Sequence, residues 1–290
     1  MKIAIDNSSG AVKAADLTKA VVALNHQLLD VAKFWNITAT VQVGSVSTAD
    51  VTIFLSKTLN NQGILGFHDI LSSGRPYGLV YTTLSQQLGE PWTVTLSHEV
   101  LEAVVDPEVN RYAVGDHPTI PGRTVFFWYE SGDPVQAENY LQDSVAVSNF
   151  VLPLYFTPGN EPGTSTKNDF MRATGRKSGT LSSLGLSPGG YVGFYDPVLG
   201  QDDVVFADKR AEERHAIKQG IGAYRRAARY RSRVQGMASP APAAPQRIGI
   251  AEALRYVKDV EVIVQRLQQA TDAGLSDVDV SGLDLPSFAP

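Results

Sequence analysis

Four side chains that could hold or move a proton or bind an ion lie close together in residues 95–108, TLSHEVLEAVVDPE. They are His98, Glu99, Glu102 and Asp106. On an α-helix, residues i and i+4 lie on one face about one turn apart, so His98 and Glu102 can bind one ion together. Glu99 is rotated from His98 by about 100° around the helix, which puts its carboxylate beside such an ion. A general base that takes a proton from water must stand there, so the spacing predicts a metal-dependent hydrolytic site.

This pattern is that of the H-E-x-x-H zinc proteases, with glutamate in place of the second histidine. The alternative is a surface helix whose histidine and glutamates are merely solvated. Asp106 follows His98 by about two helical turns, too far to bind the same ion on a straight helix. We expect Asp106 to terminate the helix or to orient a ligand.

A catalytic zinc ion keeps three protein ligands, so a further donor is needed. The best downstream segment is FFWYESGDPVQ, residues 126–136, in which an apolar strand ends at Glu130 and a glycine-containing turn presents Asp133. We favour Glu130 as the ligand and Asp133 as its orienting partner, and the reverse assignment stays open. The bland alternative is a solvated strand end followed by an Asp-initiated turn.

Two carboxylates and one neutral imidazole would cancel the charge of a divalent ion. Less residual charge weakens the polarisation of a carbonyl and the acidity of bound water. The H-E-x-x-E pattern makes Zn²⁺ the expected ion, and the weak residual charge then predicts either a slow zinc hydrolase or a site that uses Mn²⁺ or Ca²⁺, which prefer oxygen ligands.

The segments SHEVLEAVVDP, ESGDPVQ and VSNFVLPLYFTPG together resemble the zincin-like metallopeptidases that carry an H-E-x-x-E helix. A more distant similarity is to the plant phosphate-induced (Exordium-like) proteins. The resemblance covers roughly residues 75–160. It implies a zincin-like fold, metal ligands at His98 and Glu102 with Glu130 or Asp133, and Glu99 as the catalytic base. It brings no substrate, and a peptide or protein substrate is expected only from the peptidase interpretation of the site. The chain departs from the family in having neither an export signal nor a cysteine after the Glu-x-x-Asp element.

The surrounding pattern predicts an α/β (α+β) fold, with a mixed sheet packed on the active-site helix. Helices are expected over residues 13–34 and 93–106, the second ending before Pro107. Strands are expected over residues 2–7, 38–45, 50–56, 77–83, 123–130, 146–156, 191–197 and 203–208, the last two forming a hairpin. We expect the strand at 77–83 to lie at the edge of the sheet and to pair with an extended substrate peptide.

The other histidines have simpler interpretations. His26 falls within the first expected helix, and His117 lies in a loop rich in proline and glycine. His68, in GFHDI, could line the cleft, but we expect it to have a structural role in a loop. Tyr129 is adjacent to Glu130, and the alternation of side chains along a strand would turn it away from the site.

Composition divides the chain into a body and an appendage. We expect a zincin-like domain at 1–207, a basic helical segment at 208–236, a Pro/Ala linker at 237–246 and an amphipathic helix with a tail at 247–290. The net charge is −5, yet residues 208–233 hold nine Lys/Arg against three Asp/Glu. A basic stretch of this kind can neutralise phosphates or dock on an acidic protein, so nucleic acid is a possible but disfavoured partner.

Two classes of function follow. The first is a zinc peptidase, and the second is a non-catalytic assembly protein, for example a phage virion component, that joins its neighbours through the basic segment and the C-terminal helix. No apolar run reaches the ~20 residues that span a bilayer, and the first residues lack a signal-peptide pattern. We expect a soluble protein with no membrane partner, cytoplasmic or virion-associated.

Overall fold

The computed structural model describes residues 1–44, 49–57, 66–70, 75–87, 89–157 and 166–212. It also describes the backbone of two short strands, β12 (Arg247–Gly249) and β13 (Asp277–Asp279), which pair antiparallel. The expected linker, the C-terminal helix and all but the first five residues of the basic segment lie outside the described residues. Within the described residues, no helix has both the length and the apolar character needed to cross a membrane.

A five-stranded sheet forms the first layer, in the order β2-β1-β3-β5-β4. Its strands are β1 (Lys2–Asp6), β2 (Thr40–Val43), β3 (Val51–Ser56), β4 (Gly66–Ile70) and β5 (Pro76–Tyr81). β1, β2, β3 and β5 run parallel, and β4 runs antiparallel to β5. The near-continuous apolar runs of β1 and β3 fit parallel strands that are buried on both faces.

The expected edge position of the strand at 77–83 is wrong. β5 pairs with β3 on one side and with β4 on the other, so it lies inside the sheet. The segment around His68, which we expected to be a loop, forms β4 instead and takes the end position in the sheet. An antiparallel partner for β5 was not expected because GFHDI is too short and too polar to show a strand pattern by itself.

Two long helices pack on this sheet and on each other. α1 (Ala14–Trp35) ends at Asn36, whose φ of 53° is left-handed and whose N–H donates to the carbonyl of Ala32. α3 (Trp92–Val105) follows the short α2 (Thr82–Gln87) and ends before Pro107, as expected. Leucine and valine side chains of both helices share one core with β1, β3 and β5.

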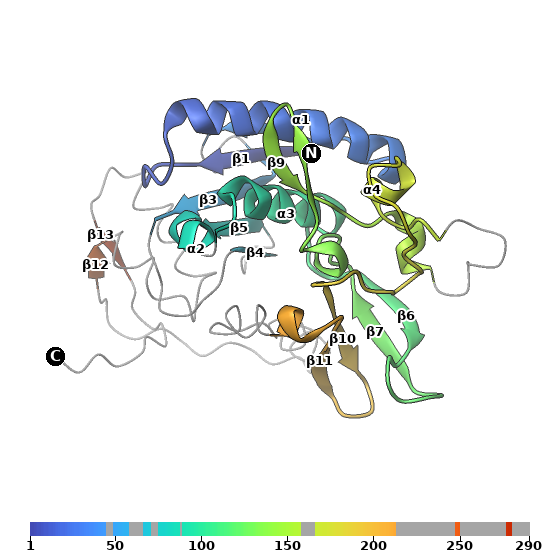
Figure 1. The fold of residues 1–290 in the computed structure, drawn as a ribbon. Coiled ribbons are helices and arrows are strands. Elements are labelled where there is room, and N and C mark those ends of the chain that lie inside the picture. Colours follow the sequence, from blue (N-terminus) through green and yellow to red (C-terminus); the bar gives the residue numbers. More distant parts are fainter. Residues whose placement is uncertain are drawn as a thin grey trace.

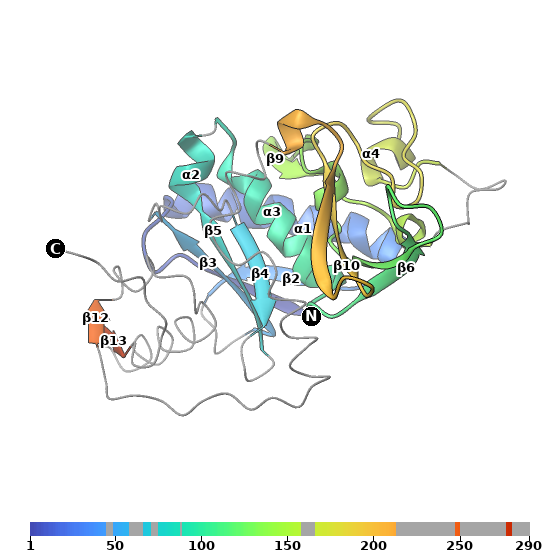
Figure 2. The same ribbon diagram turned by 90° about the horizontal axis from the view of Figure 1, so that it is seen from below.

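A second, antiparallel sheet has the order β11-β10-β7-β6. Its strands are β6 (Tyr112–Asp116), β7 (Thr124–Trp128), β10 (Tyr191–Asp196) and β11 (Gln201–Phe206). The expected hairpin of β10 and β11 is confirmed. In both views the second sheet lies beside the five-stranded sheet, and it has a core cluster of its own that includes Phe127 and Phe194 (Figures 1 and 2).

Short elements lie between β7 and β10 along the chain. They are η2 (Asp133–Val135), β8 (Asn139–Gln142), β9 (Val145–Ser148), η3 (Pro153–Phe156) and α4 (Phe170–Ala173). The strand expected at 146–156 is correct only at its start, because Pro153 opens a 3₁₀ turn. α3 contacts β3, β4 and β5 on one side and β9 on another, so this helix is enclosed within the fold (Figure 1). The described fold is thus mixed α/β, as expected.

Candidate metal centre

The H-E-x-x-E segment lies on a buried helix. All residues of α3 from 94 to 105 are buried, and His98, Glu99 and Glu102 are 9 %, 4 % and 4 % exposed. The alternative of a solvated surface helix is therefore wrong. Ionisable groups are rarely buried unless they are paired or bind a metal, so this burial requires partners.

Asp133 supplies one partner. Its Oδ1 lies 3.3 Å from Nε2 of His98, and the same nitrogen lies 3.1 Å from Oε1 of Glu102. One donor atom from each of these three residues falls within 4.8 Å of the others, an arrangement that could hold a metal ion. η2 begins at Asp133, directly after the turn that leaves β7, so the loop carries this carboxylate onto α3.

Gly132 allows this close approach. A Cβ at position 132 would overlap the imidazole ring of His98, so no other residue fits without a shift of the ring or the loop. The Gly132 N–H also donates to Oε1 of Glu102 at 3.2 Å. The glycine in the ESGD sequence therefore allows the loop to contact the helix directly.

His68 is a residue of the site that the sequence analysis did not select. Its Nδ1 lies 3.4 Å from Oε2 of Glu102 and 3.7 Å from Oε2 of Glu99. Its Nε2 lies 3.8 Å from Oε2 of Glu130. His68, Glu99 and Glu102 form a second group whose donor atoms lie within 4.8 Å of one another. In the sequence, the available indication of this role was that His68 lies in a short segment between glycines, just before the apolar strand expected at 77–83.

β4 brings His68 to α3 at close range. A Cβ at Gly66, two residues before His68 on β4, would lie 2.7 Å from Oε1 of Glu99 and 2.8 Å from the methyl group of Thr95. The absence of a side chain at Gly66 thus lets the edge strand sit directly on the helix. The edge strand and the acidic face of α3 form one site.

Tyr191, at the start of β10, is a further neighbour. Burial, followed by the negative charges of Asp133 and Glu102, raises the pKa of Tyr191 well above its usual value, and its side chain hydrogen-bonds Asp133. The phenol is therefore a neutral hydroxyl that donates to the carboxylate. Sequence analysis placed this residue in a hairpin and assigned it no role.

The two remaining predicted residues, Glu130 and Asp106, lie outside both groups of candidate ligands. Glu130 contacts His68 but belongs to neither metal-binding group, so the structure brings Asp133 rather than Glu130 to His98. Asp106 lies outside both groups and accepts the N–H groups of Asn110 and Arg111, both at 3.1 Å. Its expected role in ending the helix is confirmed. Which carboxylate binds an ion stays a prediction.

The residues that we expected to lie outside the site do so. Tyr129 stacks on Phe156, with ring centroids 3.8 Å apart. His117 packs edge-on against Phe194, 5.1 Å away, and its Nδ1 accepts the Thr119 N–H. His26 forms an exposed ion pair with Asp143.

Mutual attraction between the imidazoles and the carboxylates sets the protonation of the centre. Burial by itself lowers the pKa of His68, but the charges of Glu130 and Glu102 outweigh it and raise that pKa to about 10. Burial likewise lowers the pKa of His98, and Glu102 and Asp133 raise it well above its usual value. Without an ion, the neighbouring carboxylates therefore favour the protonated form of both imidazoles.

The two glutamates of α3 respond in opposite directions. Burial raises the pKa of Glu99, and the partial offset from His68 and His98 does not cancel this effect. Burial also disfavours the charge of Glu102, yet His98 and His68 hold its pKa well below the usual value. Glu102 is thus the anionic centre of the cluster, and Glu99 is a carboxyl group that can exchange a proton more readily.

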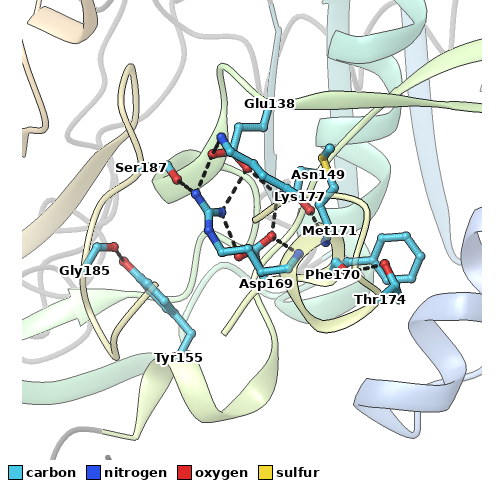
Figure 3. Close-up of polar contacts among 11 residues, drawn as sticks. Glu138, Asn149, Tyr155, Asp169, Phe170, Met171, Thr174, Lys177, Gly185 and Ser187 are labelled. Atoms are coloured by element: carbon cyan, nitrogen blue, oxygen red, sulfur yellow. Dashed lines mark hydrogen bonds and ion pairs between the residues drawn. The ribbon is translucent and has the colours of Figure 1, made fainter. Parts of the chain in front are cut away.

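A buried network of ionic and polar contacts joins Glu138, Asn149 and Asp169 (Figure 3). The guanidinium of Arg172 binds both oxygens of Glu138 at 3.1 Å, Asp169 at 2.8 Å and the Ser187 hydroxyl at 2.7 Å. Asn149 donates to Glu138 and Asp169, both at 2.8 Å. We call Glu138, Asn149, Asp169, Arg172 and Ser187 the clasp.

The clasp adjoins the loop that carries Asp133 through backbone contacts. The Glu138 N–H donates to the carbonyl of Val135 at 2.8 Å, and the Ser187 N–H donates to the carbonyl of Pro134 at 3.0 Å. A Cβ at Gly190 would collide with that same Pro134 carbonyl, so the segment after Ser187 presses directly on η2. Asp133 is therefore held by supports outside the centre, as metal ligands require.

The donor set and its environment fit a divalent cation. Nε2 of His68 and Oε2 of Glu99 are buried and form no hydrogen bond, which is costly unless another group satisfies them. Imidazole nitrogens and carboxylate oxygens are ligands that zinc and manganese accept. Comparison of the chain with protein-family models, curated proteins and solved structures returned no match.

Proposed function

We propose that this chain is a metal-dependent hydrolase that cleaves peptides or proteins and holds a divalent cation, most simply Zn²⁺, on His98, Glu102 and Asp133. The observation that carries the proposal is the convergence of these three buried side chains from α3 and η2, with His98 Nε2 at 3.1 and 3.3 Å from the two carboxylates. One nitrogen and two oxygen ligands leave a tetrahedral ion one open position, as catalysis requires. The resemblance to zincin-like peptidases supports the same assignment.

A cation held there would act as a Lewis acid toward a carbonyl and would acidify a bound water. Glu99 is the general base. It follows His98 directly on α3, and its buried Oε2 forms no hydrogen bond and lies 3.7 Å from Nδ1 of His68, so this oxygen can accept a proton. It then donates that proton to the leaving amine.

Tyr191 and the clasp position Asp133. The hydroxyl of Tyr191 donates to the Asp133 carboxylate, which fixes the direction of the remaining lone pairs. The clasp holds the backbone of η2 from the other side. Together they keep one ligand in place before any ion binds.

The substrate class follows from the position of β4. Among the described strands β4 pairs only with β5, and we assign its other edge to an extended peptide, which would have to displace the groups that bury His68, Asp69 and Ile70. His68 on this strand lies 3.7 Å from Glu99, so a peptide added along β4 would run beside the general base. This assigns to β4 the role that the sequence analysis gave to the strand at 77–83.

The test separates binding from catalysis. Purified protein should bind Zn²⁺ and cleave casein. Glu99→Gln should abolish cleavage while Zn²⁺ stays bound, whereas His98→Gln should lose the ion. Asp116→Asn, an exposed carboxylate on β6, is the matched control and should change neither property. Protein that binds no divalent cation, or a Glu99→Gln variant with full activity, would refute the proposal.

The assembly function depends on the appendage at 247–290 and remains a separate proposal, because its helix lies outside the described residues. Metal-free protein that forms rings or sheets in electron micrographs would favour it over hydrolysis.

A further inference from the structure

Glu102 directs its two oxygens to two different histidines. Oε1 lies 3.1 Å from Nε2 of His98, and it also accepts the Gly132 N–H. Oε2 lies 3.4 Å from Nδ1 of His68. The two groups of potential ligands, His98 with Asp133 and His68 with Glu99, therefore share this one carboxylate and use opposite oxygens of it.

The second group has the features of a binding site in its own right. His68 and Glu99 come from β4 and α3, and their side chains are only 3 % and 5 % exposed. Oε2 of Glu99 is buried and forms no hydrogen bond. The His68 nitrogen that faces it is Nδ1, 3.7 Å away, whereas Nε2 of His68 faces Glu130. Buried polar atoms without partners carry a desolvation cost that an ion would remove. The donor types, one nitrogen and two oxygens, are the same as in the first group.

We propose that His68, Glu99 and Glu102 form a second divalent-cation site, bridged to the first by the Glu102 carboxylate. Bridged pairs of cations in proteins lie about 3.5–4 Å apart. Two ions at that separation repel each other, so the second ion binds more weakly than the first. The site can therefore be empty at low metal concentration and filled at high concentration.

Occupation of the second site has a regulatory consequence, which rests on the proposed hydrolase function. An ion on Oε2 of Glu99 takes the electron pair that would accept the proton from water. The first equivalent of metal then activates hydrolysis, and excess metal inhibits it. The same ion covers His68 on the edge strand where the peptide is expected.

Stoichiometry measured by calorimetry on the metal-free full-length chain tests the second site without reference to activity. We expect two equivalents of Zn²⁺, the second at least tenfold weaker. His68→Gln should bind one equivalent only, and Glu102→Gln should lose both. His26→Gln, which changes an exposed histidine of α1, is the matched control and should bind two.

A second measurement covers the case in which His68→Gln does not fold. The electron paramagnetic resonance spectrum of the wild-type chain with two equivalents of Mn²⁺ should show an exchange-coupled pair, because a bridging carboxylate couples the two ions. A spectrum of isolated Mn²⁺ ions, or two equivalents bound by folded His68→Gln, would overturn the second site. One equivalent in the wild-type chain would overturn it and leave the hydrolase intact, whereas no bound cation would refute both.

Discussion

Oδ1 of Asp133 lies 3.3 Å from Nε2 of His98, and Gly132 beside it touches the same imidazole ring. The loop that carries Asp133 and helix α3 thus meet without an intervening side chain from position 132. Of the two carboxylates that the sequence left open, Asp133 is the one that lies against His98, whereas Glu130 faces His68.

The choice of ligand can be tested by exchanging each carboxylate for its amide. Asp133→Asn should weaken Zn²⁺ binding by on the order of 100-fold or more, because a direct ligand is lost. Glu130→Gln should weaken the tighter site by less than about tenfold, since it removes only charge near His68. Calorimetric titration of both variants measures this difference. The opposite ranking would make Glu130 the ligand.

The contact between loop and helix leaves no room for a methyl group. Gly132→Ala should lower the free energy of unfolding by about 1–3 kcal/mol, the usual cost of overpacking, and should reduce the bound Zn²⁺. Ser131→Ala, one residue earlier, removes a buried hydroxyl oxygen that forms no hydrogen bond and should be close to neutral. Urea unfolding and metal analysis compare the two. Equal stability of both alanine variants would contradict the packing argument.

Loss of the Arg172 side chain, which belongs to the clasp, should lower the free energy of unfolding more than loss of its exposed neighbour Lys177. Arg172→Met leaves Glu138 and Asp169 buried without their main cation and should cost about 3–5 kcal/mol. Lys177, whose side chain is 37 % exposed, also contacts Glu138, but Lys177→Met should cost at most about 1 kcal/mol. Urea unfolding of both variants gives the comparison. A small effect at Arg172 would mean that the network does not hold the loop.

The clasp also predicts a dependence of stability on pH. Burial alone would raise the pKa of Glu138, but hydrogen bonds from Lys177, Ser187 and Arg172 lower it below the ordinary 4.5. A carboxyl group whose folded-state pKa is depressed stabilises the fold above its unfolded pKa, and this stability is lost as pH falls through the folded-state value. The free energy of unfolding should therefore fall below pH 4.5, and less steeply in Glu138→Gln. Identical pH profiles for the two proteins would contradict this assignment.

The sequence was informative where the pattern is local. The helix that carries His98, Glu99 and Glu102 shows its spacing within one segment, and Pro107 marks its end. The role of Asp106 follows in the same way, because a residue just before a proline ends a helix and can cap the following turn.

The sequence was insufficient where pairing is non-local. His68 enters the centre only because β4 pairs antiparallel with β5, and GFHDI alone has too few residues to show a strand period. Tyr191 arrives from a strand some sixty residues after the ligand loop. Which of Glu130 and Asp133 lies next to His98 depends on the path of the turn between them. Contacts of Gly132 and of the clasp set this path, and residue spacing alone does not predict it.

The contact at Gly132 brings together segments that belong to two different hydrophobic cores. α3 contributes Leu96, Val100 and Leu101 to the core of the five-stranded sheet, whereas Val135, two residues after Asp133, belongs to the core of the antiparallel sheet. An ion bound by both His98 and Asp133 would therefore link these two hydrophobic cores. With the ion bound, the two cores should then unfold in a single cooperative transition. After removal of the ion, they should unfold independently.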